Sequence, residues 1–264
     1  MMQMSQLALI VILLYLAIAA VLWQQWIRPS PKALSPILLA TPALVLHAVL
    51  IGWQVFAVGG VLDFSLPNVA SLVLLLVAAV LTLGHQSLKS LLLLPPVYLL
   101  CAMVITPAMT ESNHYFTNFV GMTGLAVHVS LAVLSYCCMF IAALMAVQVW
   151  LIDYRLKHHG PLAGLPPLMV VNRQLSLLLR IGFFLLTASI VIGWHFLEGF
   201  FGHGQGHKAI LTVAAWLIYA YVLWVDWRIG MSAKRMAIFS IVSASVLTLA
   251  YFGSRFIKEV LLSS

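Results

Sequence analysis

The sequence predicts an all-α, polytopic integral membrane protein, on the evidence of its composition and of the length of its apolar runs. Of its 264 residues, 64% are hydrophobic and only 7% are charged, a balance that soluble globular domains do not have. Runs of about 20 apolar residues recur along the whole chain, and about 20 helical residues are needed to cross the ~30 Å hydrocarbon core of a bilayer. We therefore expect a bundle of about eight transmembrane helices.

The first four helices are predicted from apolar runs that prolines separate. Their ranges are residues 6–27, 33–56, 68–84 and 88–108. The first run contains Ala17-Ile18-Ala19, which resembles a signal-peptide cleavage site. However, no Lys or Arg precedes this run and it continues to Trp26, so we interpret it as a retained helix. Helix-breaking prolines lie in or next to the connections; they are Pro31, Pro36, Pro67 and Pro107.

The last four helices are predicted in the same way. Their ranges are residues 120–152, 175–200, 209–225 and 236–256. Pro161, Pro166 and Pro167 mark the connection after the fifth helix. The chain has no internal repeat and no break in composition, so we expect a single transmembrane domain spanning residues 1–264. Its three cysteines lie inside apolar runs without CxxC spacing, which indicates neither a disulfide framework nor a zinc site.

The basic residues predict the orientation of the helices. With both termini outside, ten of the 13 Lys and Arg residues fall on the cytoplasmic side, as the positive-inside rule requires. These ten are Arg28, Lys32, Lys89, Arg155, Lys157, Arg173, Arg180, Arg228, Lys234 and Arg235. This distribution explains the net charge of +7 without nucleic-acid binding.

The orientation can be tested with reporter fusions. Reporters fused after residues 30 and 160 should behave as cytoplasmic, and reporters at 112 or 205 as external, because translocating the charged loops across lipid is unfavourable. The measurement is the activity of a reporter pair that distinguishes the two compartments. An external reporter at 160 would contradict the predicted orientation.

Three histidines are the candidate functional residues. In the predicted orientation His47, His128 and His195 all lie in the outer half of the membrane. Ionisable groups inside a membrane are costly and usually face a cavity, a partner or a cofactor. Neutral imidazole is a good iron ligand, and histidines on facing helices hold haem in helix bundles.

Two other interpretations of these histidines remain open. Each imidazole could hydrogen-bond to a neighbouring helix and stabilise the bundle, or His47 and His128 could line a transport path together with Gln54. Small residues share the helix face of His128, so either a flat macrocycle or another helix can approach the backbone closely there. These small residues are Gly121, Gly124, Ala132 and Ser135.

Several stretches, in their order along the chain, resemble the CcsA/CcmC cytochrome c assembly family, whose members handle haem in membranes. "LAVHVSLAVLSYCCMFIAALMAV" at 125–147 is similar to the family's His-Val-Ser…Ser-Tyr helix. "AAWLIYAYVLW" at 214–224 and the helix at 234–255 resemble its last two helices, and "LVLHAVL" at 44–50 resembles its early membrane histidine. "WLIDYRLK" and "LPPLM" point to its small YpjD-like branch. The resemblance is good over 120–256 and thinner before it.

The resemblance implies roles for two histidines. His47 matches the intramembrane haem-ligand histidine of the family, and His128 matches the first of two histidines that hold a second haem at the outer surface. The chain departs from the family in other places. Residues 194–208 read "WHFLEGFFGHGQGHK" where the family has a tryptophan-rich WWD segment, Trp224 replaces a membrane histidine, and no late outer histidine follows 255.

These observations lead to one expected function. We expect a multi-pass protein of the bacterial inner membrane that takes part in cytochrome c assembly and binds haem b. His47 and His128 would be iron ligands, with His195 as a further cofactor-binding residue, on one haem or two. Other assembly proteins or apocytochrome are the expected partners. The sequence has no nucleophile–base pair, carboxylate pair or phosphate loop, so we do not expect an enzyme. The alternatives are a small-molecule or proton-coupled transporter and an accessory subunit without a site.

The acidic residues are expected to have structural roles. They are solvated or loop-capping residues in this interpretation, not catalytic acids; the four considered are Asp63, Glu111, Asp153 and Asp226.

Overall fold

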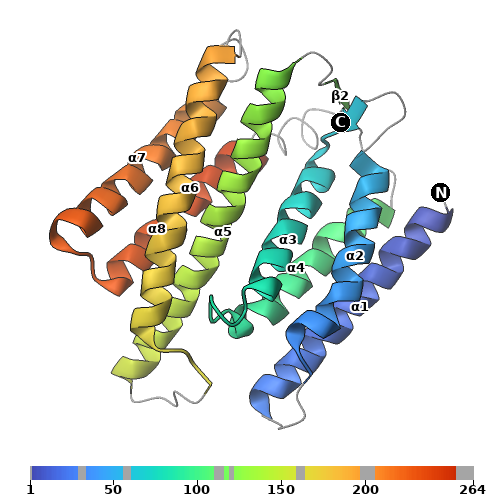
Figure 1. Cartoon of the computed structure of the whole chain (residues 1–264), viewed down its shortest axis with the longest axis horizontal. Coiled ribbons are helices and arrows are strands. Elements are labelled where there is room, and N and C mark those ends of the chain that lie inside the picture. Colours follow the sequence, from blue (N-terminus) through green and yellow to red (C-terminus); the bar gives the residue numbers. More distant parts are fainter. Residues whose placement is uncertain are drawn as a thin grey trace. The chain divides into compact units, whose positions relative to one another are not determined.

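The structure is a computed structural model, and it confirms an all-α polytopic membrane helix bundle. It describes residues 2–28, 34–55, 61–109, 116–118, 122–158, 164–196 and 206–253. Over these residues the chain forms eight α-helices (Figure 1). Seven helices among the described residues are long and apolar enough to cross a membrane. The contacts divide the chain into two compact units, residues 1–118 and 119–264.

Unit 1 contains four helices and a pair of short strands. The helices are α1 (Met2–Ile27), α2 (Pro36–Val55), α3 (Leu66–Leu83) and α4 (Leu94–Ile105). Helix α1 packs against α2 and α4, and α3 packs against α2 and α4. The strands β1 (Val61–Asp63) and β2 (Phe116–Asn118) pair antiparallel, which the sequence analysis did not anticipate. The first predicted span is one continuous helix.

The fourth predicted span, 88–108, is a shorter α-helix than expected. Helix α4 has 12 residues and is flanked by the 3-10 turns η1 (Leu91–Leu93) and η2 (Thr106–Met109). The reason lies at its start, where Pro95 and Pro96 occupy the first turn of α4. Proline has no amide hydrogen, so it is favoured in the first turn of a helix, where that hydrogen would lack a helical partner.

Unit 2 contains the four remaining helices. They are α5 (Thr123–Lys157), α6 (Leu168–Phe196), α7 (Gly206–Ile229) and α8 (Ala233–Thr248), and the π-helical turn η3 (Leu249–Gly253) follows α8. Helix α5 packs against α6 and α8, and α7 packs against α6 and α8. Gly230 ends α7 with a φ of 73°, and its amide donates to the carbonyl of Asp226 at 3.2 Å. A glycine adopts this left-handed backbone without steric cost.

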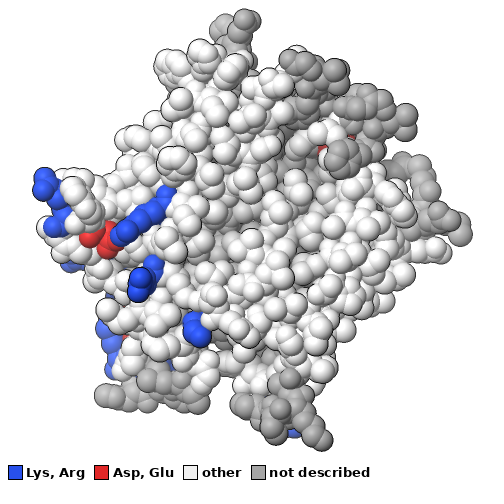
Figure 2. Space-filling model, viewed as in Figure 1, with Lys and Arg blue, Asp and Glu red and all other residues white. Residues whose placement is uncertain are grey.

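Basic side chains gather at one end of unit 2. Figure 2 shows Lys and Arg over the end of the unit where α5 and α7 stop and α6 and α8 begin, while the apolar sides of these helices carry none on this face. This clustering is what positive-inside loops produce. Which side of the membrane this end faces stays a prediction, as does the single domain over 1–264.

The described acidic residues have structural partners. Asp63 is 2% exposed, and its carboxylate accepts the amide hydrogen of Ser65 at 3.0 Å. It therefore stabilises the turn before α3 and is not solvated. Asp153 pairs with Lys157 at 2.7 Å, one turn later on α5. Glu111 lies outside the described residues.

Candidate functional site

His47 lies on α2 in the core of unit 1. Its side chain is 0% exposed. The Tyr15 hydroxyl of α1 lies 3.0 Å from its Nδ1, and the Ser71 hydroxyl of α3 lies 2.8 Å from its Nε2. The Tyr15 ring also meets the imidazole edge-on, with centroids 5.5 Å apart. One histidine thus joins three helices of unit 1.

Both ring nitrogens of His47 are occupied by hydroxyl groups. A hydroxyl can donate or accept, so one hydroxyl donates to the ring and the other accepts from it in either neutral tautomer. This arrangement satisfies a buried imidazole completely, as expected for a histidine that links membrane helices. To bind a metal, His47 would have to give up one of its two hydroxyl contacts.

The hydrogen-bonded region continues around Tyr15. Its ring stacks on that of Tyr98 with centroids 5.6 Å apart. The Tyr98 hydroxyl lies 2.7 Å from the Thr82 hydroxyl, which donates in turn to the carbonyl of Ala78. These polar groups in the core of unit 1 therefore pair with one another, as a membrane interior requires.

His128 lies on α5 in unit 2 and has a different environment. Its side chain is partly exposed. Its Nδ1 lies 2.8 Å from the backbone carbonyl oxygen of Ser189 on α6. The Ser189 hydroxyl also lies 3.2 Å from this nitrogen. We assign the proton to Nδ1, because its shorter contact is with a carbonyl oxygen, which only accepts. The lone pair of the neutral ring is therefore on Nε2, which makes no hydrogen bond to any other described residue.

At His128, Gly124 and Ser135 the small-residue face of α5 lies against α6, while Gly121 lies outside the described residues. The Ser189 hydroxyl donates to the backbone carbonyl of His128 at 3.2 Å, and the Ser135 hydroxyl donates to the carbonyl of Gly182 at 3.0 Å. The two contacts are seven residues apart on both helices, which keeps one antiparallel register over two turns. The sequence allowed either a flat macrocycle or another helix to approach this face. In the structure it is another helix.

Gly124 allows the end of α6 to approach the backbone of α5 closely. A Cβ atom added at Gly124 would lie 2.7 Å from the Cβ of Phe196 and closer still to its ring carbon Cγ. A Cβ added at Gly182 would meet the flexible end of Met139 at 3.0 Å. Of these two glycines, only Gly124 would bring a methyl group within 2.7 Å of atoms fixed close to the backbone; at Gly182 the nearest such atom, the Cβ of Cys138, would be 3.2 Å away.

These glycines provide a matched stability test. We expect Gly124→Ala to lower the free energy of unfolding by about 1–3 kcal/mol, since overpacking must displace the end of α6. Gly182→Ala should cost less, because the Met139 thioether can move aside. Thermal denaturation of both variants in mild detergent measures the difference. Equal losses would contradict the assigned contact with Phe196.

His195 is also on α6, but it does not face α5. It is exposed, and its ring makes an edge contact with the neighbouring Phe196 at 4.8 Å. At about 100° per residue it is turned roughly 120° away from Ser189. His114 and His203 lie outside the described residues. Among the residues that the structure describes, no three His, Cys, Asp or Glu side chains gather to hold a metal ion.

The three candidate histidines share none of their described contacts. All of the described contacts of His47 lie in unit 1, and those of His128 and His195 lie in unit 2. Among them, only His128 combines a fixed tautomer with an available nitrogen.

Comparison with known proteins identifies the family. The family described as "Cytochrome C assembly protein" matches residues 38–262. The chain belongs to the cytochrome c assembly family. It is 34% identical over 228 residues to "Inner membrane protein YpjD" of Escherichia coli (strain K12), covering 85% of this chain and 87% of that protein. No solved structure matches the chain.

A more distant relative is also similar. The chain is 28% identical over 142 residues to "Uncharacterized 28.8 kDa protein in nifR3-like 5'region" of Azospirillum brasilense, covering 51% of this chain and 52% of that protein. Seven long apolar helices and the likeness to an inner membrane protein agree. This cytochrome c assembly family member is a multi-pass inner-membrane protein.

The sequence of this family member singles out the histidines as candidates but does not indicate their partners. Tyr15 and Ser71 hold His47, and the carbonyl of Ser189 holds His128. A tyrosine within the first apolar run was a usable signal, because a buried phenol in a membrane needs a partner. A backbone carbonyl carries no such signal.

Proposed function

We propose that this cytochrome c assembly protein binds haem b in the membrane with His128 as an axial ligand of the iron. It serves assembly by holding and positioning haem, and it performs no group-transfer chemistry itself. Redox and ligand-binding chemistry belong to the haem when bound, while the protein supplies ligands, orientation and access. The observation that carries the proposal is the hydrogen bond from Nδ1 of His128 to the carbonyl of Ser189.

That hydrogen bond has the geometry of a metal-ligand histidine. Such histidines almost always donate their second ring N–H to a carboxylate, a carbonyl or water, which fixes the tautomer and the ring orientation. In His128 the donation leaves Nε2 as the iron-binding nitrogen. The partial exposure of the side chain leaves this nitrogen accessible, and an uncharged ring suits a membrane interior.

His47 fits the same role less directly. Its ring would coordinate iron through Nε2 only after the Ser71 hydroxyl had moved away, or through Nδ1 after Tyr15 had moved. We propose His47 as a weaker iron ligand within unit 1, because its binding competes with the Ser71 hydrogen bond, and His195 as an exposed reserve ligand. Haem, the bilayer and other cytochrome c assembly proteins or apocytochrome are the proposed partners.

The absorption spectrum of the purified protein tests this function. Protein produced with ample haem and purified in mild detergent should show a Soret band that shifts on reduction, as histidine-ligated haem does. A folded protein without a Soret band would contradict the proposal. That result would favour an accessory subunit or a transporter, since His47 already shows the contacts of a packing histidine.

A further inference from the structure

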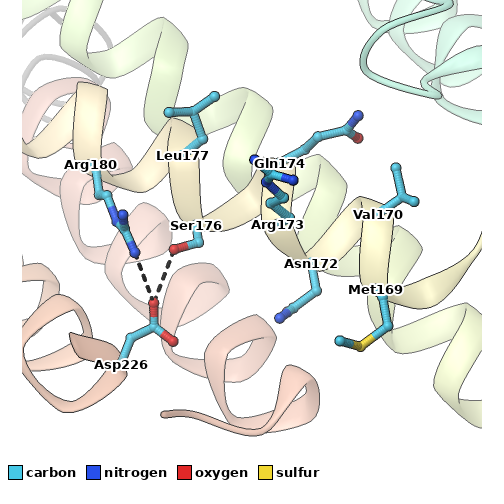
Figure 3. Close-up of a pocket in the computed structure, with 9 residues that line it drawn as sticks. All are labelled: Met169, Val170, Asn172, Arg173, Gln174, Ser176, Leu177, Arg180 and Asp226. Carbon is cyan, nitrogen blue, oxygen red and sulfur yellow. Dashed lines mark hydrogen bonds and ion pairs between the residues drawn. The ribbon is translucent and has the colours of Figure 1, made fainter. Parts of the chain in front are cut away.

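A polar pocket lies at the basic end of unit 2, far along α6 from Ser189. It has a volume of about 700 Å³ and is lined by residues of the first half of α6 together with Asp226 near the end of α7. The lining combines cationic, amide, hydroxyl and apolar side chains (Figure 3). None of these residues belongs to the proposed haem site.

One arginine of the pocket is held in place by an acid. Arg180 and Ser176 both point to Asp226 in Figure 3. The Ser176 hydroxyl donates to the Asp226 carboxylate at 3.0 Å, and a guanidinium nitrogen of Arg180 lies 3.6 Å from the same oxygen. The Arg180 side chain is still 63% exposed. Since a guanidinium carries five N–H donors, it keeps donors for a second anion.

The second arginine has no acidic partner. Arg173 lies seven residues before Arg180, which places both on one face of α6 about 10 Å apart along the axis. It is exposed and makes no ion pair with any acid in the described part of the chain. The buried Oδ1 of Asn172 also lacks a hydrogen-bond partner among the described residues. The pocket therefore has unused positive charge and an unused acceptor.

Two tryptophans indicate the depth of this pocket. Trp224 and Trp227 flank Asp226 on α7 and are 58% and 75% exposed. Exposed tryptophans at the end of a membrane helix mark the headgroup region of the bilayer. The ion pair to Asp226 places Arg180 at the same level. Met169 and Leu177, which also line the pocket, are exposed apolar side chains that acyl chains can contact.

We propose that this pocket binds the headgroup of an anionic phospholipid. The phosphodiester would lie between Arg173 and Arg180, a headgroup hydroxyl would donate to Asn172, and the acyl chains would pass over Leu177. Basic pockets between membrane helices bind anionic headgroups in this way. Asp226 orients Arg180 and weakens the attraction, so the site favours a lipid that also gains apolar contacts over a small soluble anion.

Native mass spectrometry of the full chain provides the test. The protein is released from micelles containing either phosphatidylglycerol or phosphatidylcholine, and the retained lipid is counted. Wild type should retain phosphatidylglycerol in preference to phosphatidylcholine. Arg173→Gln should weaken phosphatidylglycerol retention about fivefold, the effect of one cation near an anionic surface. Asp226→Asn should strengthen it, because it removes the competing negative charge.

Arg228→Gln is the matched control. Arg228 is exposed at the same end of unit 2, packs on the Trp227 ring at 5.5 Å and does not line the pocket. Its replacement removes the same charge and should leave retention unchanged. If Arg173→Gln and Arg228→Gln lost phosphatidylglycerol equally, retention would depend on the overall positive charge of this end and not on the pocket. That result would overturn the proposal. Equal retention of both lipids by wild type, or displacement of phosphatidylglycerol by millimolar inorganic phosphate or glycerol phosphate, would overturn the lipid assignment.

Discussion

Replacing His128 by Ala should abolish the Soret band while the yield of folded protein stays close to that of wild type. The band should disappear because Nε2 of His128 is the proposed iron ligand. The fold should survive because the ring is partly exposed and its interhelical hydrogen bonds reach a single residue, through the carbonyl and the hydroxyl of Ser189. Hydrogen bonds between membrane helices contribute only about 0.6 kcal/mol on average.

Two variants serve as controls for this result. His195→Ala removes an exposed imidazole from α6 and should retain most of the haem. Ser189→Ala removes the hydroxyl but keeps the carbonyl that fixes the His128 tautomer, so its spectrum should resemble that of wild type. Absorption spectra and size-exclusion profiles measure both properties. A His128→Ala protein with an undiminished Soret band would remove His128 from the site.

Replacing His47 by Ala should destabilise the fold, unlike the replacement of His128. The change leaves a cavity and two buried hydroxyls, those of Tyr15 and Ser71, without their partner. We expect the free energy of unfolding to fall by about 2–4 kcal/mol. Thermal denaturation in detergent measures it. A fully stable His47→Ala protein would show that the three-helix contact contributes little.

Ser71→Ala separates ligation by His47 from packing. If His47 binds iron through Nε2, the Ser71 hydrogen bond exists only without haem, and losing it should tighten haem binding by about fivefold, equivalent to ~1 kcal/mol. If His47 only packs, haem affinity should not change while stability falls slightly. Haem titration of the apoprotein distinguishes these outcomes, and Ser130→Ala, an exposed serine on α5, is the control.

The apolar runs predicted the helices well because hydrocarbon thickness imposes a length on every span. The sixth helix, predicted at 175–200, begins earlier, at Leu168. The predicted range excluded Arg173 because a charged residue was expected outside the apolar span, whereas it belongs to a helix that reaches the headgroup region. The β1–β2 pair was missed because three-residue strands leave no periodic pattern.

The candidate histidines could be predicted from the sequence, but the ring nitrogen that each one leaves available could not. Composition alone singled out histidines inside apolar runs, since such residues are rare there. It could not decide which nitrogen each ring would leave available, because that depends on partners 24 to 61 residues away in the sequence. Likewise Arg173 and Arg180 were interpreted only as topology signals, and the pocket they line emerged from the packing of α6 and α7.

The carbonyl that orients His128 has a consequence for how this protein can change over evolutionary time. Every amino acid carries a backbone carbonyl, so another small residue at position 189, which is buried against α5, would keep the acceptor, and an alanine scan would pass over it. The feature that selection must preserve is the alignment of α5 with α6. An insertion or deletion within either helix would shift this alignment by about 1.5 Å per residue. The site should therefore tolerate small residues opposite His128, but almost no change in helix length.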